Sequence, residues 1–378
     1  MRVLIVCPGL GYGGAETQII ALARGLQARG HAVAIYSLVS GTGRADEVRA
    51  AGIPLWEDSK RSRMDWQLLG RLRDVVTSFQ PQLVHGFLFD GNLYARLAVF
   101  GRGIPVLCAE RSSDYELRPI QQWVHRATSW MTTGVIANSW AGADLARRMY
   151  GGLKNHIHVV WNGIDVASVR ARAARASGLR EQLAIPADAK IACFVGSVKP
   201  DKDFLLATAV CQALLALPGQ PWHIIFIGAP FQQFLPYAQV GMNEMQRYAA
   251  EVEQAFEQLS APDRVHRLGT SKQVIELMAQ CNVLFSTSLR EGFPNVVLEA
   301  MTAGIPVIST AYSDIRMILP EAWQVIEQRD GALLAAAIER AANDTELSAR
   351  QQAWVDQHAT LDVAVLALET VYQQYIQP

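Results

Sequence analysis

The chain has 378 residues, of which 50% are hydrophobic and 18% are charged, a balance that excludes a disordered polypeptide. Its length exceeds what one ordinary hydrophobic core supports and predicts two domains of somewhat under about 200 residues each. The formal net charge is −1, yet residues 1–165 carry 18 Lys and Arg against 13 Asp and Glu, a net of +5, which leaves −6 for the remainder. This asymmetry favours a phosphate, a pyrophosphate lipid or a membrane surface as a partner of the first half and is too small to indicate nucleic acid.

The cysteines and the N-terminus indicate where in the cell the protein is expected. The five cysteines are scattered without a CxxC pair, so we expect buried thiols and no metal site: Cys7, Cys108, Cys193, Cys211 and Cys281. The apolar run Val3–Val6 is followed by Pro8 and is typical of a first strand rather than of a signal peptide. No run approaches the roughly 20 apolar residues of a membrane-spanning helix. We therefore expect a cytoplasmic protein, with contact to the inner face of the membrane as an open alternative.

In the first half, short apolar strands alternate with longer helical patterns. The expected strands are Val3–Cys7, Ala32–Ser37, Leu83–Phe87, Val106–Cys108 and Val135–Ala137, with Ile157–Val160 as a candidate edge strand. Strands that are apolar throughout are typical of a parallel sheet buried on both faces by helices.

The same pattern restarts after residue 188, behind an Ala- and Arg-rich linker segment, Ala167–Leu183. Its expected strands are Ile191–Val195, Ile224–Ile227, Val265–Leu268, Val283–Ser286 and Val307–Ser309. Residues 331–350 and 361–376 are helical in pattern, and the last helix needs an apolar surface to pack on. We predict an α/β fold of two Rossmann-like doubly wound domains facing across a cleft, with ligands at the carboxyl ends of the strands.

A glycine-rich loop, Gly9–Gly14, separates the first strand from the helical pattern Glu16–Arg29. Glycines let a ligand approach the backbone, and the helix N-terminus favours an anion. The spacing of Gly9, Gly11 and Gly14 does not fit GxGxxG, and no acidic residue ends the second strand, which argues against a nicotinamide dehydrogenase. A plain strand-to-helix turn accounts for the loop equally well.

A second loop, Gly196–Phe204, carries Lys199 and Lys202 between a strand and a helix. Two lysines at such a turn can neutralise a phosphate that faces a helix N-terminus. The alternative for this loop, taken alone, is a solvated charged surface.

The most informative segment is Ser286–Met301, in which Glu291 and Glu299 flank Gly292, Pro294 and Asn295. Proline is favoured at the first helical position, so a helix is expected to begin near Pro294. Glu291 then precedes the helix, and Glu299 lies about one turn inside it. Both carboxylates can accept hydrogen bonds from sugar hydroxyls beside a diphosphate bound at the helix start. The alternative is a capped helix with two solvated glutamates.

Together these segments resemble the retaining glycosyltransferases of family 4, which have the two-domain GT-B fold. The resemblance covers nearly the whole chain and lies in segments that occur in the family's order: Gly13–Glu16, Val135–Ser139, Val159–Asp165, Phe194–Asp203 and Glu291–Met301. It implies an acceptor domain at 1–166, a linker at 167–188, a nucleotide-sugar donor domain at 189–360 and a C-terminal helix at 361–378 that crosses back to the first domain.

The resemblance also implies residue roles. Glu291 would contact hydroxyls of the donor sugar, Glu299 would hold the ribose, and Lys202 would neutralise the diphosphate. The donor-binding set would be Gly13, Gly14, Gly196, Ser197, Lys199, Lys202, Glu291, Gly292, Phe293, Pro294, Asn295, Val296 and Glu299. The anomeric configuration would be retained without a metal ion or other cofactor, because the nucleotide sugar is a co-substrate.

Two positions depart from the family pattern. Ser197 stands where many relatives have an arginine, which makes Lys199 the candidate substitute. Many relatives carry a histidine where this chain has Glu110 and Arg111, so Glu110 joins Glu291 and Lys202 as a catalytic candidate. The acceptor candidates are His85, Arg111 and Asp114.

The expected function is transfer from a nucleotide sugar, with UDP-sugar favoured, to a glycan or lipid-linked acceptor in surface polysaccharide biosynthesis. A sugar-nucleotide epimerase or hydrolase of the same fold and a non-catalytic glycan-binding relative are the alternatives. One stretch mixes tryptophans with basic residues and is a candidate membrane contact: Trp56, Lys60, Arg61, Arg63, Trp66, Arg71 and Arg73. A solvated helix face with two core tryptophans is the favoured explanation of that stretch.

Overall fold

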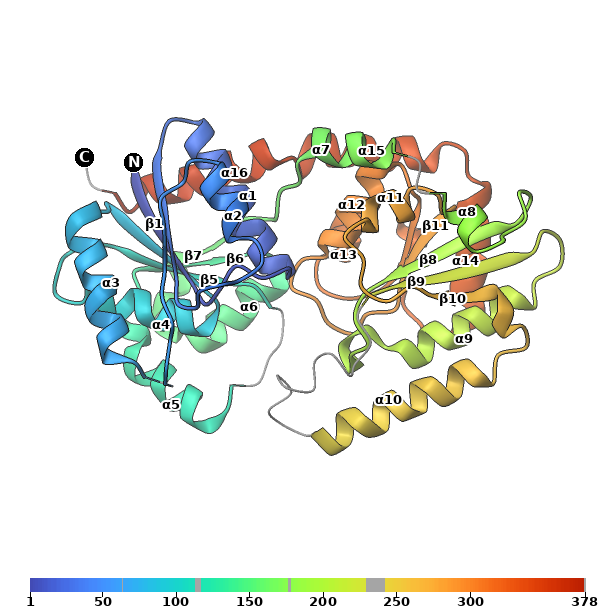
Figure 1. Cartoon of the computed structure of the whole chain (residues 1–378), viewed down its shortest axis with the longest axis horizontal. Coiled ribbons are helices and arrows are strands. Elements are labelled where there is room, and N and C mark those ends of the chain that lie inside the picture. Colours follow the sequence, from blue (N-terminus) through green and yellow to red (C-terminus); the bar gives the residue numbers. More distant parts are fainter. Residues whose placement is uncertain (63, 113–116, 176–177, 229–241, 377–378) are drawn as a thin grey trace. The chain divides into compact units, whose positions relative to one another are not determined.

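The computed structural model describes residues 1–62, 64–112, 117–175, 178–228 and 242–376 (Figure 1). Their contacts divide the chain into two compact units. The first consists of Met1–Asp165 with Ala359–Pro378, and the second of Val166–His358. The last twenty residues therefore belong to the unit in which the chain begins.

The first unit contains a seven-stranded parallel sheet in the order β3-β2-β1-β4-β5-β6-β7. The strands are β1 Arg2–Cys7, β2 Ala32–Ser37, β3 Leu55–Glu57, β4 Leu83–Phe87, β5 Val106–Glu110, β6 Gly134–Ala137 and β7 Ile157–Val159. Every strand expected from residues 1–165 is present, including the edge strand β7. The strand β3 was not expected, because it has only three residues and none of them is buried.

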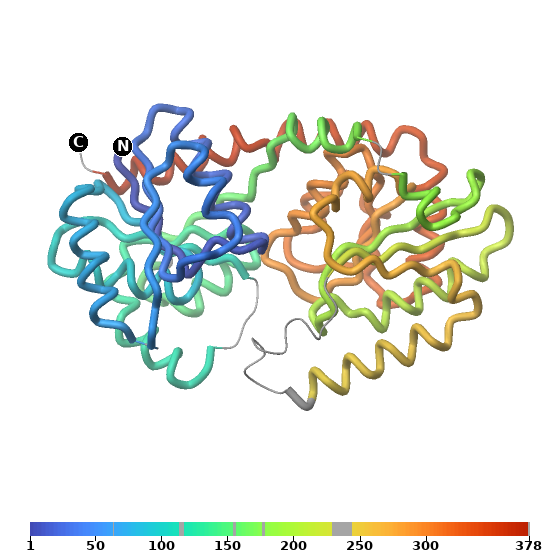
Figure 2. Tube along the Cα trace, in the orientation of Figure 1, coloured from blue at the N-terminus to red at the C-terminus, as the bar shows by residue number. Residues whose placement is uncertain are grey.

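Helices cover both faces of this sheet: α1 Gly14–Ala28, α2 Ala45–Ala50, α3 Trp66–Phe79, α4 Leu88–Val99, α5 Pro119–Thr128, α6 Trp140–Met149 and α16 Leu361–Gln373. The C-terminal helix α16 packs beside α1, and Figure 2 shows the first and last segments of the chain side by side. Val365, Leu368 and Tyr372 of α16 are buried in the same core cluster as Val3 and Ile5 of β1. The apolar face of α16 thus has the surface that its sequence requires.

The second unit contains a six-stranded parallel sheet in the order β10-β9-β8-β11-β12-β13. Its strands are β8 Lys190–Val195, β9 Trp222–Ile227, β10 Val265–Arg267, β11 Val283–Ser286, β12 Val307–Thr310 and β13 Val325–Ile326. The strand order reverses between β8 and β11, and in open α/β sheets ligands bind beyond the carboxyl ends of the strands at such a point. The strand β13, with two residues, was not expected.

The helices of the second unit are α7 Val166–Ala173, α8 Leu179–Gln182, α9 Phe204–Leu215, α10 Met242–Glu257, α11 Val274–Met278, α12 Asn295–Ala303, α13 Ile315–Ile318, α14 Gly331–Asn343 and α15 Leu347–His358. The expected linker segment Ala167–Leu183 forms α7 and α8, and α7 packs on α11 and α12. Arg172 of α7 makes two hydrogen bonds to the Glu276 carboxylate of α11, at 2.9 and 2.8 Å. This segment is therefore an integral part of the second unit.

Candidate functional site

The helix α12 begins at the carboxyl end of the second sheet, after β11 and a loop of eight residues. Pro294 is its N-cap residue and makes no side-chain cap hydrogen bond, while Gly304 ends the helix in the left-handed conformation at φ 81°. The sequence prediction of a helix starting near Pro294 is therefore confirmed. The N-terminus of a helix presents backbone N–H groups and a positive dipole end, which is the physical basis of anion binding.

Lys202 and Glu291 form an ion pair beside this helix start. The hydroxyl of Ser288 donates to the same Glu291 oxygen at 3.0 Å, so the carboxylate is held from two directions. Lys202 arrives on the loop after β8, and its Cε would lie 3.2 Å from a Cβ at Gly196, which explains the small residue there. The fold thus joins two loops that the sequence marked separately.

A hydrogen-bonded scaffold fixes the backbone at Lys202. Asp203 adopts the left-handed conformation at φ 44° and caps α9 by accepting from the Leu206 N–H. The Thr287 hydroxyl donates to the carbonyls of Lys202 and Asp203, at 2.8 and 2.9 Å. Arg329 donates to the Asp203 carboxylate at 2.6 Å and also to the Thr287 carbonyl. One arginine therefore connects the lysine loop to the glutamate loop.

The sequence analysis did not identify Arg329. It lies more than forty positions after Thr287, outside any motif, and only the fold brings it close. Thr287, in contrast, could have been identified from the sequence. It belongs to a run of hydroxyl residues, Ser286–Ser288, and hydroxyl side chains at the end of a parallel strand can form hydrogen bonds to neighbouring loops.

Glu299 lies inside α12, which packs on α7, and is partly buried. Burial raises the pKa of its carboxyl from 4.5 to about 7, and the nearby Arg172 opposes this shift. Among the residues that the structure describes, none donates a hydrogen bond to this carboxylate, because Arg172 is engaged with Glu276. A partly buried acid without such a donor is well suited to accept hydrogen bonds from a polyhydroxyl ligand.

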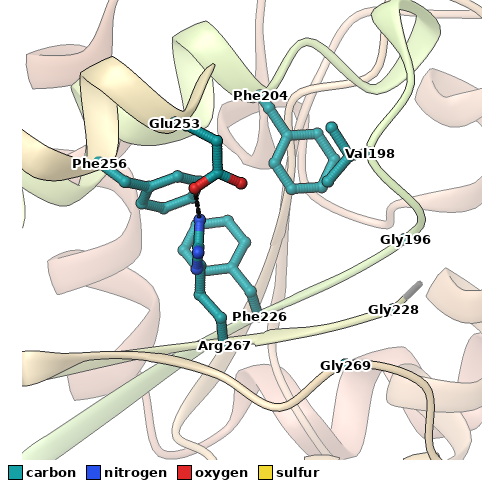
Figure 3. Close-up of a pocket in the computed structure, with 9 residues that line it drawn as sticks. All are labelled: Gly196, Val198, Phe204, Phe226, Gly228, Glu253, Phe256, Arg267 and Gly269. Atoms are coloured by element: carbon teal, nitrogen blue, oxygen red, sulfur yellow. Dashed lines mark hydrogen bonds and ion pairs between the residues drawn. The ribbon is translucent and has the colours of Figure 1, made fainter. Parts of the chain in front are cut away.

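Three glycines follow the strands β8, β9 and β10: Gly196, Gly228 and Gly269 (Figure 3). The Gly228 N–H donates to the Gly269 carbonyl at 2.9 Å. Its φ of 156° and the carbonyl of Gly196, which a Cβ at Gly228 would overlap, exclude any larger residue. The strand ends can therefore approach one another closely.

Beside these glycines is a cavity of about 210 Å³ with aromatic walls formed by Phe204, Phe226 and Phe256 (Figure 3). An ion pair of Glu253 and Arg267, at 2.6 Å, borders it. Neither Lys202 nor Glu291 nor Glu299 lines the cavity, so it does not mark the place where the charged groups converge.

The remaining donor candidates of the second unit surround the helix start. Phe293 and Pro294 are buried, whereas Gly292, Asn295 and Val296 are partly exposed. Ser197 is partly buried and Lys199 is exposed on the loop after β8. The donor roles expected for these residues stay predictions.

In the first unit, the glycine loop ends where α1 begins. Gly13 is the N-cap residue, Gly14 is the first helical residue, and both are exposed. A Cβ at Gly13 would overlap the Glu16 carboxylate, which folds back over the helix start. The loop therefore places its glycines at the surface, as the donor-binding prediction requires, and leaves that role untested.

Glu110 and Arg111 occupy the carboxyl end of β5. The buried Glu110 carboxylate accepts from the backbone N–H groups of Arg111 and Ser112, at 3.0 and 3.2 Å. Arg111 donates to the side chain of Asn162 at 2.7 Å and lies over the ring of Phe87. Burial lowers the pKa of Arg111 to about 10, while Glu110 acts in the opposite direction. Glu110 thus fixes the backbone of the loop that follows β5. Its catalytic role stays a prediction. The acceptor candidate Asp114 lies outside the described residues.

His85, an acceptor candidate from the sequence, is buried in the first unit. The ring is 1% exposed, is hydrogen-bonded through Nδ1 to the Tyr372 hydroxyl at 2.7 Å and packs against Phe87. Burial, with a contribution from Arg111, lowers its pKa to about 3. The helix α16 contacts this histidine through Tyr372, and the acceptor role of His85 stays a prediction.

The candidate membrane stretch in and before α3 is largely paired within the fold. Arg71 donates to the Asp58 carboxylate at 2.7 Å, and Lys60 pairs with Asp90 at 2.6 Å. Trp56 is partly buried, whereas Trp66 is 68% exposed, so only one tryptophan belongs to the interior. Arg63 lies outside the described residues. Neighbouring carboxylates thus neutralise Lys60 and Arg71, and Arg73 donates to the Leu97 carbonyl.

The chain matches two families of known proteins. The protein family described as Glycosyltransferase Family 4 matches residues 12–168. The family described as Glycosyl transferases group 1 matches residues 177–354. The two matches together cover nearly the whole chain and divide it close to the boundary between the two units.

Two curated relatives match with moderate identity. A D-inositol 3-phosphate glycosyltransferase of Streptomyces avermitilis is 26% identical over 64% of this chain and 52% of that protein. A GDP-mannose:cellobiosyl-diphosphopolyprenol alpha-mannosyltransferase of Xanthomonas campestris is 25% identical over 74% of this chain and 68% of that protein. The match thus spans about half the length of the first relative.

Solved structures share the fold over the full chain. Anabaena HepE in complex with UDP superposes with a TM-score of 0.79 at 19% identity, covering 99% of this chain and 100% of that one. The UDP-glucose complex of the same protein gives a TM-score of 0.77 at 22% identity and the same coverage. At such identities the likeness concerns the fold alone.

Proposed function

Because the chain belongs to the glycosyltransferases of family 4 and group 1, whose GT-B fold its two parallel-sheet units share, we propose that it transfers a sugar from a nucleoside-diphosphate sugar to a glycan or lipid-linked acceptor. The observation that carries the proposal is the ion pair of Lys202 and Glu291 beside the N-terminus of α12. It puts a cation, a helix dipole and a carboxylate within one small region.

Each group of this region has a part in donor binding under the proposal. Lys202 and the N–H groups at the start of α12 bind the diphosphate, since both supply positive charge to an anion. Glu299 accepts from the ribose hydroxyls, and Glu291 accepts from hydroxyls of the donor sugar. In the donor-free state Lys202 and Glu291 pair with each other, so that neither charge lacks a partner.

We propose UDP as the nucleotide of the donor. The complexes of HepE with UDP and UDP-glucose support this choice, whereas the mannosyltransferase relative uses GDP-mannose by its name. A parallel screen of UDP-, GDP- and ADP-sugars by thermal shift decides among them, because a ligand that binds only the native state raises its melting temperature.

The reaction is proposed to retain the anomeric configuration and to need no metal ion. When the glycosidic bond to the diphosphate breaks, negative charge develops on the departing phosphate oxygen. A preorganised ammonium and aligned helix N–H groups stabilise such charge at the place where it forms. Activity that persists in a chelator, and a product whose anomeric proton has the donor's configuration by NMR, are the expected results.

The acceptor is proposed to be a glycan or a lipid-linked saccharide of surface polysaccharide biosynthesis. The polyprenol-linked acceptor in the name of the mannosyltransferase relative supports this class. In this chain, Arg111 at the carboxyl end of β5 offers a guanidinium for a phosphate or hydroxyl of the acceptor, oriented by its hydrogen bond to Asn162.

The function is tested by product analysis with the wild type and Glu291→Gln. The wild type should transfer sugar to an added acceptor, and Glu291→Gln should lose transfer at least about a hundredfold, as for removal of a group that contacts the reacting sugar. Since the substitution frees Lys202, UDP binding should persist in the variant. Release of free sugar at the same rate without an acceptor would instead identify a hydrolase, and wild-type transfer by Glu291→Gln would remove the donor assignment.

A further inference from the structure

The segment that ends β12 and follows it holds the loop that carries Glu291. The hydroxyl of Thr310, the last residue of β12, donates to the Ser288 carbonyl at 2.9 Å. The hydroxyl of Ser313 donates to the Gly292 carbonyl at 2.8 Å. Because Ser288 and Gly292 lie on either side of Glu291, these two hydrogen bonds fix the backbone before and after the glutamate.

Ser313 has a backbone conformation that is costly for serine. Its φ of 38° lies in the left-handed region, where the Cβ of an L-residue crowds the following carbonyl oxygen. Glycine adopts this conformation without that cost, so a turn that only redirects the chain would favour glycine. A serine held in such a conformation indicates that its side chain has a task at this position.

The chain around Ser313 is firmly fixed. Ser313 is partly buried, and its neighbours Tyr312 and Asp314 are buried. The N–H of Ile315, the first residue of α13, donates to the Tyr312 carbonyl at 3.1 Å and closes the turn around Ser313. The hydroxyl of Ser313 is therefore presented to the Gly292 carbonyl by a backbone that has little freedom to move.

Tyr312 adds a second contact to the same region. Burial raises the pKa of its hydroxyl, and the negative charge of Glu291 adds to this rise. The tyrosine is therefore uncharged and lies near the glutamate. The segment after β12 thus supports Glu291 with a buried ring as well as with the hydroxyls of Thr310 and Ser313.

The hydrogen bond to Gly292 fixes more than one atom. A peptide unit is planar, so a fixed Gly292 carbonyl also fixes the direction of the Phe293 N–H and the position of the chain that enters α12. The same carbonyl is one residue away from the Cα of Glu291. Ser313 therefore limits where the Glu291 carboxylate can lie in relation to the helix start.

We propose that Ser313 is a positioning residue that sets Glu291 for contact with the sugar of the donor and is not needed for binding of the nucleotide. This inference rests on the proposed function, in which Glu291 accepts from sugar hydroxyls while Lys202 and the start of α12 bind the diphosphate. The backbone of Lys202 is held by Thr287 and Arg329, so the lysine has supports that do not include Ser313.

The test is titration calorimetry of the full chain with two ligand pairs, UDP with UDP-glucose and GDP with GDP-mannose. The variants Ser313→Gly and Ser313→Ala both remove the hydroxyl. In the pair that the wild type binds, each variant should bind the nucleotide sugar about fivefold more weakly, as for loss of one hydrogen bond. Each should bind the nucleotide alone within about twofold of the wild type.

The two variants separate the hydroxyl from the backbone strain. Ser313→Gly relieves the left-handed conformation and Ser313→Ala retains it, so the glycine variant should have the higher melting temperature of the two. Both should nevertheless lose the same affinity for the nucleotide sugar. Thr302→Val is the control, because it removes a buried hydroxyl that donates to the Leu298 carbonyl within α12, at 2.6 Å, and should bind both ligands like the wild type.

Three results would overturn the inference. Wild-type affinity of Ser313→Gly for the nucleotide sugar would mean that the hydroxyl has no part in donor binding. An equal loss of affinity for the nucleotide and for its sugar conjugate would mean that Ser313 supports the second unit in general. A wild type that binds neither ligand pair would contradict the proposed function itself, and this inference with it.

Discussion

Arg329 is the residue whose contribution to the site is least visible in the sequence. Its guanidinium holds the Asp203 carboxylate and the Thr287 carbonyl, and these two residues carry the backbone of Lys202. It does not itself form the ion pair of Lys202 and Glu291, so it is a positioning residue.

We expect Arg329→Ala to raise the KM for the donor about tenfold, with a smaller effect on kcat, because a displaced Lys202 weakens diphosphate binding. Arg329→Lys should restore little, since an ammonium cannot bridge the two acceptors as a planar guanidinium does. Arg316→Ala is the control, because Arg316 also pairs with a carboxylate, Glu327, at an exposed position. An equal loss of activity in Arg316→Ala would show that the effect is not specific to the site.

Glu299 gives the site a pH dependence. Its pKa is raised from 4.5 to about 7 by burial, so the folded state binds a proton that the unfolded state has released between these two pH values. The free energy of unfolding must then fall as pH rises from 4.5 to about 7. Glu299→Gln removes this loss and should be more stable than the wild type above pH 7, by about 1–2 kcal/mol after allowance for solvent at the partly exposed carboxyl.

Melting temperatures between about pH 3 and pH 8 check this prediction. Glu276→Gln is the matched control on the adjoining helix, because its ion pair with Arg172 lowers the pKa of Glu276. That variant should be less stable than the wild type at neutral pH and approach it as the pH falls below about 4. A constant difference between Glu299→Gln and the wild type across the pH range would contradict the account of Glu299.

Sequence reasoning at this scale worked where a motif carries its own geometry. The proline and the two acids of Ser286–Met301 predicted the helix start, and the fold placed Lys202 at Glu291. It failed for Arg329, which no motif surrounds, and it did not predict the burial of His85 under α16. A histidine at the end of a strand has the same sequence pattern whether a ligand or a distant helix such as α16 covers it.

At the scale of elements, α16 packs on partners that are distant in the sequence. Leu368 is 1% exposed in the core that α16 shares with α1 and β1, whereas Leu366 on the same helix is 52% exposed. Leu368→Ala should lower the free energy of unfolding by about 2–5 kcal/mol, the usual cost of truncating a buried leucine. Leu366→Ala should change it by less than about 0.5 kcal/mol.

Denaturant unfolding followed by circular dichroism measures both values. Similar values for the two leucines would mean that α16 is not docked on the first unit in solution.

Strands were predictable wherever an apolar run filled both faces of a parallel sheet, as in β1, β2 and β4. The edge strands β3 and β13 lack such runs, because an edge strand of two or three residues needs little apolar surface. The linker segment was only partly predictable. Its composition indicated helix, but the packing of α7 on α11 and α12, with the ion pair of Arg172 and Glu276 between α7 and α11, involves residues about a hundred positions away.

For the whole molecule, the two-domain division and the doubly wound sheets followed from length and from the restart of the strand pattern after residue 188. The acceptor was not predictable, because its recognition depends on side chains from several loops whose assembly no single segment encodes. The buried loop contacts of Glu110 and Arg111 illustrate this, since both residues were singled out from the sequence but their partners were not.

The central claim is that Lys202 and the start of α12 bind the diphosphate of the donor. Titration calorimetry of UDP against the wild type and Lys202→Met tests it most directly. The control is Lys190→Met, which removes the lysine that pairs with Glu339 at the opposite end of β8. We predict that Lys202→Met weakens UDP binding at least about tenfold, as for loss of a charge-assisted contact, while Lys190→Met binds like the wild type. Equal affinity of the wild type and Lys202→Met for UDP would contradict the account.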